Sequence, residues 1–178
     1  MYKSDGTKLM VEGDGFSNAL PMYDDMKSGS LFRSDDLVPF SFDLKKFTGT
    51  YESSGPNRGT PRTFQATIDY SVGAYGKRKT TTIKVNEPLH IGDSKVYLVS
   101  HGYAPVVTVR DGKGKVVYRD AVPLLPLDGN VTSNGVVKVM DGYKDPRGKS
   151  EQLGFQAFFV PTFDPKSGTM MSQFPAPL

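Results

Sequence analysis

Apolar and polar residues alternate most regularly in two runs within the first half of the chain. The apolar positions of these runs are Phe40, Phe42, Leu44, Phe64, Ala66, Ile68, Tyr70 and Val72. A period of two places alternate side chains on opposite faces of a strand, so each run predicts a strand with one buried face. The segment 53–61 between them is rich in Gly, Ser and Pro and is predicted to be a loop. We therefore expect the two strands to pair as a long hairpin.

Shorter strand patterns continue through the rest of the chain. They cover residues 80–85, 95–100, 106–110, 115–119, 136–140 and 153–160. The Asp-Gly-Lys-Gly sequence at 111–114 predicts a hairpin turn, because Gly and Asp tolerate positive φ. Residues 8–12 are a further candidate for a short strand. Residues 18–27 are predicted to form one or two helical turns, with Asn18 as the N-cap.

This density of short strands and turns predicts an all-β fold. The expected architecture is an antiparallel sandwich or an irregular barrel with at most one short helix. The 19 Gly and 13 Pro agree with many turns, and the 11 Phe and 9 Tyr supply core volume. We predict a β domain over residues 36–160, an N-terminal arm over 1–35 and a Pro-rich, extended C-terminal arm over 161–178.

Charge and cysteine content narrow the possible functions. The 22 Lys and Arg are interleaved with 19 Asp and Glu, and the net charge of +3 does not predict a nucleic-acid partner. The absence of Cys excludes disulfides, thiolate metal sites and thiol chemistry. A modest basic cluster consists of Lys77, Arg78, Lys79, Lys113, Lys115 and Arg119. A solvated surface is the default explanation of this cluster, and its functional alternatives are contact with anionic lipid or steering of an acidic partner.

The residues that carry catalysis do not assemble into a recognisable pattern. His90 and His101 are the two histidines of the chain. Ser100 precedes His101, but adjacent strand residues point to opposite faces, so this pair is no evidence for a catalytic triad. The acidic pairs at 24–25 and 35–36 lack the further oxygen ligands that Ca²⁺ requires. The sequence therefore predicts neither an active site nor a metal site.

The segment 82–98 carries a family resemblance. Its characteristic residues are Ile83, Val85, Asn86, Pro88, Leu89, Gly92, Val96 and Tyr97. The pattern resembles the extracytoplasmic domain of ResB/CcsB-type proteins of system II cytochrome c biogenesis, particularly the actinobacterial branch. Further matching segments lie at 15–18, 36–40, 102–111, 124–130 and 152–155. One position departs from the pattern, because many members carry His after the Asn of the motif and this chain has Glu87.

The resemblance implies an assembly role without catalysis by this domain. Such proteins are multi-span membrane proteins that act with a ResC/CcsA-like partner to deliver haem and join it to apocytochrome c. This implies a domain on the extracytoplasmic face of the cell membrane, with its C-terminal arm leading towards a membrane segment outside the chain. Haem would be handled by the full complex and would not be a resident cofactor here. The candidate residues are His90 and His101 for haem, and Asn86, Pro88, Tyr97 and Tyr103 for partner contact.

Other interpretations stay open beside this one. The motif at 86–89 has a purely structural explanation, because Asn86 can initiate a turn and Pro88 restricts both itself and Glu87. The domain could also be a surface β-sandwich scaffold, or a module that binds peptides by strand addition without a role in haem transfer. An all-β enzyme of an unrecognised class would require a cleft that brings His101 together with carboxylates.

Overall fold

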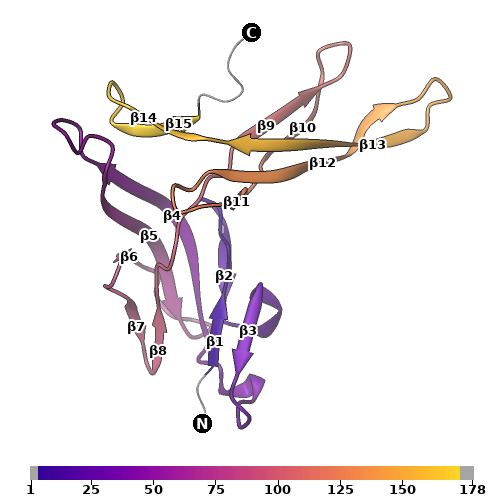
Figure 1. The fold of residues 1–178 in the computed structure, drawn as a ribbon. Coiled ribbons are helices and arrows are strands. Elements are labelled where there is room, and N and C mark those ends of the chain that lie inside the picture. The colour runs from indigo at the N-terminus through magenta and orange to yellow at the C-terminus, as the bar shows by residue number, and fades with distance from the viewer. Residues whose placement is uncertain (1–3, 173–178) are drawn as a thin grey trace. The chain divides into compact units, whose positions relative to one another are not determined.

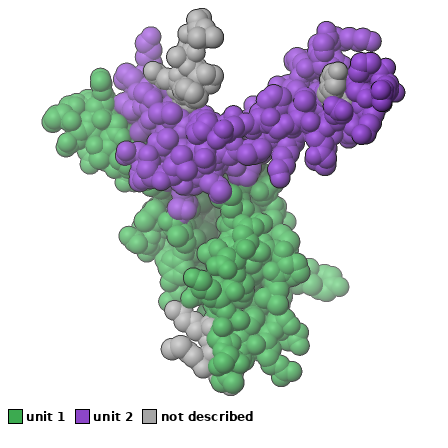
Figure 2. Space-filling model, turned by 45° about the vertical axis from the view of Figure 1, so that its right-hand side comes forward, with its two compact units in different colours: residues 1–99 green, residues 100–178 purple. Residues whose placement is uncertain are grey.

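The computed structural model describes residues 4–172, apart from the side chains of Tyr143 and Ser172. It contains fifteen strands and two 3₁₀ turns over these residues (Figure 1). Every strand pair is antiparallel, and no sheet in the described part closes into a barrel. The predicted all-β class is therefore confirmed. The chain divides into two compact units, residues 1–99 and 100–178, which Figure 2 colours separately.

The first unit is built on a four-stranded sheet in the order β2-β4-β5-β6. Its strands are β2 (Gly15–Ser17), β4 (Phe40–Tyr51), β5 (Pro61–Val72) and β6 (Lys79–Lys84). Strands β4 and β5 form the predicted hairpin, in which Phe40 lies opposite Val72 and Tyr51 opposite Pro61. Lys45 is an extra residue in β4 that shifts the register and forms a bulge. Local alternation and a Gly- and Pro-rich loop were sufficient to specify this pairing.

The core of the first unit lies on one face of this sheet. Its buried residues are Phe16, Phe40, Phe42, Ile68, Ile83 and Ile91. Three of these are the apolar positions of the predicted alternation, and Phe16 comes from β2, where its ring centroid lies 5.0 Å from that of Phe42. The alternation does not bury every apolar residue, because Val72 at the end of β5 is 47% exposed. The strand interior forms the core, and its terminus lies at the surface.

Short elements complete the first unit. They are β1 (Ser4–Thr7), η1 (Leu20–Met22), β3 (Asp25–Ser28), η2 (Ser34–Asp36), β7 (Leu89–Ile91) and β8 (Ser94–Val96). Strand β1 pairs with β3, and β7 pairs with β8. The helix predicted over 18–27 is reduced to the 3₁₀ turn η1, after which the chain enters β3. Asn18 is not an N-cap, because its amide donates to the Val38 carbonyl at 2.8 Å and its side-chain oxygen accepts from the Tyr23 hydroxyl.

The strand predicted over 8–12 is wrong. The backbone amide of Leu9 donates to the carboxylate of Asp24 at 2.6 Å, and the Lys8 ammonium donates to the other carboxylate oxygen at 2.7 Å. Gly13 donates to the carbonyl of Leu44 at 2.7 Å, which ties the end of this segment to the main sheet. The Leu9 amide thus donates to the Asp24 side chain, where in a strand it would donate to the carbonyl of a neighbouring strand. No strand ladder forms over this segment.

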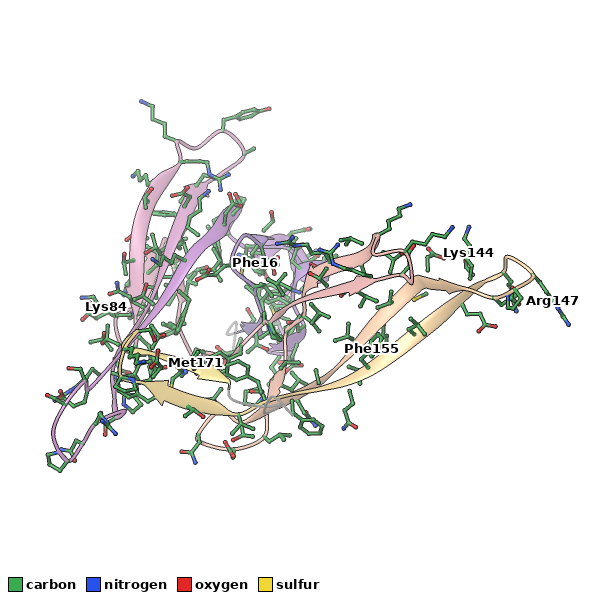
Figure 3. The ribbon with its side chains drawn as sticks, turned by 90° about the horizontal axis from the view of Figure 1, so that it is seen from above. Phe16, Lys84, Lys144, Arg147, Phe155 and Met171 are labelled. Atoms are coloured by element: carbon green, nitrogen blue, oxygen red, sulfur yellow. The ribbon has the colours of Figure 1, made fainter. Side chains whose placement is uncertain are left out.

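The second unit contains the remaining seven strands. They are β9 (Val106–Arg110), β10 (Val116–Ala121), β11 (Leu125–Pro126), β12 (Ser133–Lys144), β13 (Ser150–Phe159), β14 (Pro161–Asp164) and β15 (Thr169–Ser172). They form the sheets β9–β10, β11-β12-β13 and β14–β15. The buried core consists of Val122, Leu124, Val137 and Val139. Lys144 and Arg147 lie at the far end of the long β12–β13 hairpin (Figure 3).

Four turns of the second unit use the same device. In each, an aspartate carboxylate accepts hydrogen bonds from two backbone amides two to four residues further on, which is an Asx-type turn. The aspartates are Asp111, Asp128, Asp145 and Asp164. The predicted turn at 111–114 is one of them and is confirmed, with Gly114 at φ 81°. Hydrogen bonds, first from the Thr132 hydroxyl and then from backbone amides, hold the pKa of Asp128 below its usual value.

The segments predicted as arms contain regular structure where they are described. Residues 1–35 supply β1, β2 and β3, and β2 is hydrogen-bonded to β4 in the main sheet. Residues 161–172 form the β14–β15 hairpin, and residues 173–178 lie outside the described part. The predicted boundaries at 36 and 160 stay a prediction. Within residues 4–172, no helix is long and apolar enough to cross a membrane.

Candidate functional site

The motif at 86–89 forms a tight turn directly after β6. The amide of Glu87 donates to the carbonyl of Lys84 at 3.0 Å, and Asn86 has a φ of 66°. Asn adopts this left-handed conformation more readily than most residues with a side chain. The Lys84 ammonium also lies 3.3 Å from the Glu87 carboxylate. The structural interpretation of the motif is confirmed, and partner contact by Asn86 and Pro88 stays a prediction.

The turn leads into the β7–β8 hairpin, which borders a hollow at the surface of the first unit. Leu89 and Ile91 pack into the core, while His90 between them is exposed. The hollow has a volume of about 280 Å³. Its lining residues are Tyr70, Val72, Gly76, Lys77, Lys79, His90, Ile91 and Gly92. One predicted haem-contact residue, His90, is therefore brought together with two lysines of the basic cluster.

The hollow is electropositive because its cations have no acidic partner. No ion pair joins Lys77, Lys79 or His90 to any residue between 4 and 172. Lys95 adds a further positive charge, since it lies directly opposite His90 in the β7–β8 hairpin. Arg78 lies between the two lysines in sequence, but its guanidinium pairs with Asp43 of β4. Of the three residues of the Lys-Arg-Lys run, Arg78 thus forms an ion pair, whereas Lys77 and Lys79 line the hollow.

His101 and Tyr103 lie in the second unit, in the segment before β9. The Tyr103 ring stacks on Phe159 with centroids 4.1 Å apart, and the imidazole of His101 lies edge-on to Tyr103 at 6.4 Å. Phe159 packs against the core of this unit. Partial burial lowers the pKa of His101, so the neutral imidazole is favoured. The segment therefore presents a neutral imidazole beside a fixed pair of aromatic rings.

The predicted site residues are distributed over both units. Asn86, Pro88, His90 and Tyr97 belong to the first unit, and His101 and Tyr103 belong to the second. Tyr97 is exposed directly after β8. The basic cluster is divided in the same way, with 77–79 in the first unit and 113–119 in the second. The haem and partner roles of these residues stay predictions.

Sequence reasoning missed part of the lining of the hollow. Tyr70 and Val72 were recognised only as strand residues, and Ile91 was not singled out. Gly76 matters because a Cβ atom at its position would lie 2.0 Å from the carbonyl oxygen of Val72. The loop after β5 therefore bends closely over the strand end only with glycine there. The Gly-Ala-Tyr-Gly sequence at 73–76 signals a turn, but it does not reveal this approach.

The described residues 4–172 contain no group of three or more His, Asp or Glu side chains placed to hold a metal ion.

The model of the ResB-like family matches residues 1–178, the whole chain. The chain belongs to the ResB-like family. Its membership implies a role in cytochrome c biogenesis, in a family whose members generally act as non-catalytic components. No curated protein and no solved structure matches this ResB-like chain.

His101 makes the stability of the second unit depend on pH. Because burial keeps its pKa in the folded chain below the ordinary value of 6.5, the unfolded chain takes up the proton first as the pH falls. The free energy of unfolding is therefore unaffected by His101 above pH 6.5. It decreases as the pH falls from there towards the pKa that His101 has in the folded chain. We expect the urea midpoint of this unit to fall between about pH 7.5 and about pH 5.5, and His101→Gln to reduce that fall.

The matched control is His90→Gln, which removes the exposed histidine of the first unit. It should leave the pH dependence of the second unit unchanged. Amides of β12 and β13 followed by hydrogen exchange would assign the change to the correct unit. An unaltered pH dependence in His101→Gln would contradict the prediction.

Proposed function

We propose that this chain is an extracytoplasmic domain of a ResB-like membrane protein and that it assists haem delivery and the handling of apocytochrome c with a ResC/CcsA-like partner. The observation that carries the proposal is the family match over all 178 residues. The family implies cytochrome c biogenesis, and the all-β chain described here suits a docking role because it presents surfaces for extended ligands. Membrane attachment and the identity of the partner are parts of the proposal.

Two sheet edges support the handling of an apocytochrome segment. Strand β6 ends the order of the main sheet of the first unit, and β13 ends that of the three-stranded sheet of the second. Each pairs with one neighbouring strand among the described residues, so no further strand is paired with its other side there. An apocytochrome is an unfolded chain when haem is attached, and an extended segment can add to such an edge through main-chain hydrogen bonds.

The proposal predicts a selective defect in haem attachment. Cells that lack the gene for this protein should lose covalently haem-labelled c-type cytochromes while keeping b-type haem proteins, because only the former need attachment. Haem staining of denaturing gels measures the first, and pyridine haemochrome spectra measure the second. The wild-type gene on a plasmid should restore the c-type cytochromes. Normal c-type cytochromes in the deletion strain would overturn the proposal.

The open edges also suit a peptide-binding or scaffold module with no part in haem transfer. The two functions separate in a titration of the 178-residue chain with a CxxCH peptide and with haem. Peptide binding in the absence of haem binding, together with intact c-type cytochromes in the deletion strain, would support this second function. Haem binding and a maturation defect would support the first.

A further inference from the structure

The hollow beside His90 has the features of a ligand site that recognises a negative charge on an apolar body. Its positive groups are Lys77 and Lys79, and its exposed apolar surface comes from Val72, which is 47% exposed. The ammonium groups of two lysines around one small hollow repel each other unless an anion lies between them. The positive charges of the hollow therefore favour the binding of an anionic ligand.

Two acids of the main sheet, Asp43 and Asp69, do not neutralise these groups. Asp43 is paired with Arg78, and the carboxylate of Asp69 accepts from the Thr80 hydroxyl at 2.6 Å and lies 3.3 Å from the Lys45 ammonium. Alternation explains the separation. Lys79 lies opposite Tyr70, a core-side residue of β5, whereas Thr80 lies opposite Asp69 on the other face. The sheet thus separates an ion-paired outer face from a face whose lysines stay available.

The backbone also holds the hollow in a defined form. The loop at 73–76 folds back so closely over β5 that Gly76 has no room for a Cβ atom beside the Val72 carbonyl. The amide of Gly73 donates to the carbonyl of Pro39 at 2.7 Å, which anchors the start of the loop. On the opposite side Gly92 adopts a φ of 56° in the β7–β8 turn. Both lysines therefore follow a constrained bend on one wall, and a constrained turn forms the opposite wall.

Size and chemistry together define the ligand. A space of about 280 Å³ is at the lower limit of small-molecule pockets and suits the charged edge of a ligand better than a whole one. Lys binds carboxylate or phosphate as a point charge. The exposed Val72 side chain and the partly buried Tyr70 ring next to these lysines favour a carboxylate attached to an apolar ring, because such a ligand satisfies both surfaces.

We propose that this hollow, the carboxylate hollow, binds the propionate edge of a porphyrin through Lys77 and Lys79, with the edge of the ring lying against Val72. The carboxylate specificity follows from the lining residues, and the choice of porphyrin rests on the proposed function. The binding is non-covalent and requires no metal. Haem would then be held by its carboxylates.

The test compares protoporphyrin IX with its dimethyl ester, both presented to the 178-residue chain from the same detergent micelles. Fluorescence anisotropy of the porphyrin measures binding. The two ligands share the ring and differ in the carboxylates, so the diacid should bind roughly tenfold more tightly than the ester, as expected for charge-assisted contacts. Equal binding of the two, or no binding of the diacid, would overturn the proposal.

Two variants test the walls, each with a matched control in the second unit. The double change Lys77→Ser and Lys79→Ser should weaken diacid binding roughly tenfold, whereas Lys113→Ser with Lys115→Ser removes the same charge at an exposed turn and should change it less than about twofold. Equal loss in both would show non-specific charge attraction and overturn the site.

Gly76→Ala keeps the charges of Lys77 and Lys79 but prevents the close approach of the loop at 73–76 to the Val72 carbonyl. It should weaken diacid binding, whereas Gly112→Ala, at a position where a Cβ atom would meet nothing within 4 Å, should not. Far-UV circular dichroism checks that all variants remain folded. Unaltered binding by folded Gly76→Ala would contradict a preformed hollow.

The result is distinguishable from the test of the proposed function. A chain that binds no porphyrin, in cells whose c-type cytochromes nevertheless depend on it, would overturn the carboxylate hollow and leave the biogenesis role standing. Binding to anionic vesicles, without porphyrin, that depended on Lys77 and Lys79 would overturn the porphyrin assignment in favour of lipid headgroups. Intact cytochromes in the deletion strain would remove the proposed function itself.

Discussion

Ile68→Ala is expected to destabilise the first unit by about 3 kcal/mol, within the range for large-to-small changes at well-packed sites. Ile68 is 1% exposed and lies in β5, which has neighbours on both sides. It faces Leu44 across the β4 pairing and Thr81 across the β6 pairing. Two flanking strands restrict the collapse of the cavity that the change leaves. Much of the cost is therefore expected to remain after relaxation.

The measurement is chemical denaturation combined with hydrogen exchange of the β4, β5 and β6 amides. Val72→Ala is the control, because Val72 belongs to the same face of the same strand but is 47% exposed; it should cost less than about 1 kcal/mol. A loss of similar size in both variants would show that burial at this position does not determine the stability of the sheet. Exchange that increases only outside β4–β6 would also contradict the assignment.

The hairpin that contains Ile68 could be predicted because its signals are local. Alternating residues define each strand and the loop at 53–61 defines the reversal. The β1–β3 pair carries no such signal, since its sequences, SDGT and DMKS, contain one large apolar residue between them. Contacts beyond the two strands hold this pairing, including the bond from the Leu9 amide to the Asp24 carboxylate at 2.6 Å. Tertiary context there overrides weak strand preference.

The carboxylate hollow was only partly accessible to sequence reasoning. The basic run and His90 are visible as residues, and the turn at 86–89 follows from its composition. The sequence does not reveal that Arg78 differs from Lys77 and Lys79, because this difference depends on the pairing of Arg78 with Asp43, 35 positions away. The wall formed by the β7–β8 hairpin likewise requires Ile91 to pack into the core. Long-range register determines which charges stay available, and periodicity alone does not supply it.

The second large effect is expected at Leu124, in the core of the second unit. Leu124 is 2% exposed, and Leu124→Ala should cost about 3 kcal/mol by leaving a cavity among Val137, Val139 and their neighbours. Gly135 of β12 has no space for a Cβ atom, which would lie 2.7 Å from a Leu124 methyl group. The leucine therefore fills a space that the glycine leaves open. Few alternative side chains can reach into this cavity.

Leu125→Ala provides a matched control, because the adjacent residue is also a leucine but is 61% exposed. Its cost is expected to be below about 1 kcal/mol. The two changes delete the same atoms one position apart, so a difference of roughly 2 kcal/mol or more in denaturation would measure burial alone. Equal costs, or a larger cost at Leu125, would contradict the arrangement of this core.

Leu124 also connects the core to the segment that holds His101 and Tyr103. Its amide donates to the carbonyl of Tyr103 at 2.9 Å, and the Tyr103 ring stacks on Phe159, which packs against the same core. A cavity at Leu124 should therefore loosen the aromatic pair and admit water to the neighbouring imidazole. Since burial is what lowers the pKa of His101, Leu124→Ala should raise that pKa towards its ordinary value, and an NMR titration of the imidazole would measure it. Leu125→Ala should leave the titration unchanged. An unaltered His101 titration in a destabilised Leu124→Ala chain would show that the segment is held by contacts other than the core beneath Phe159.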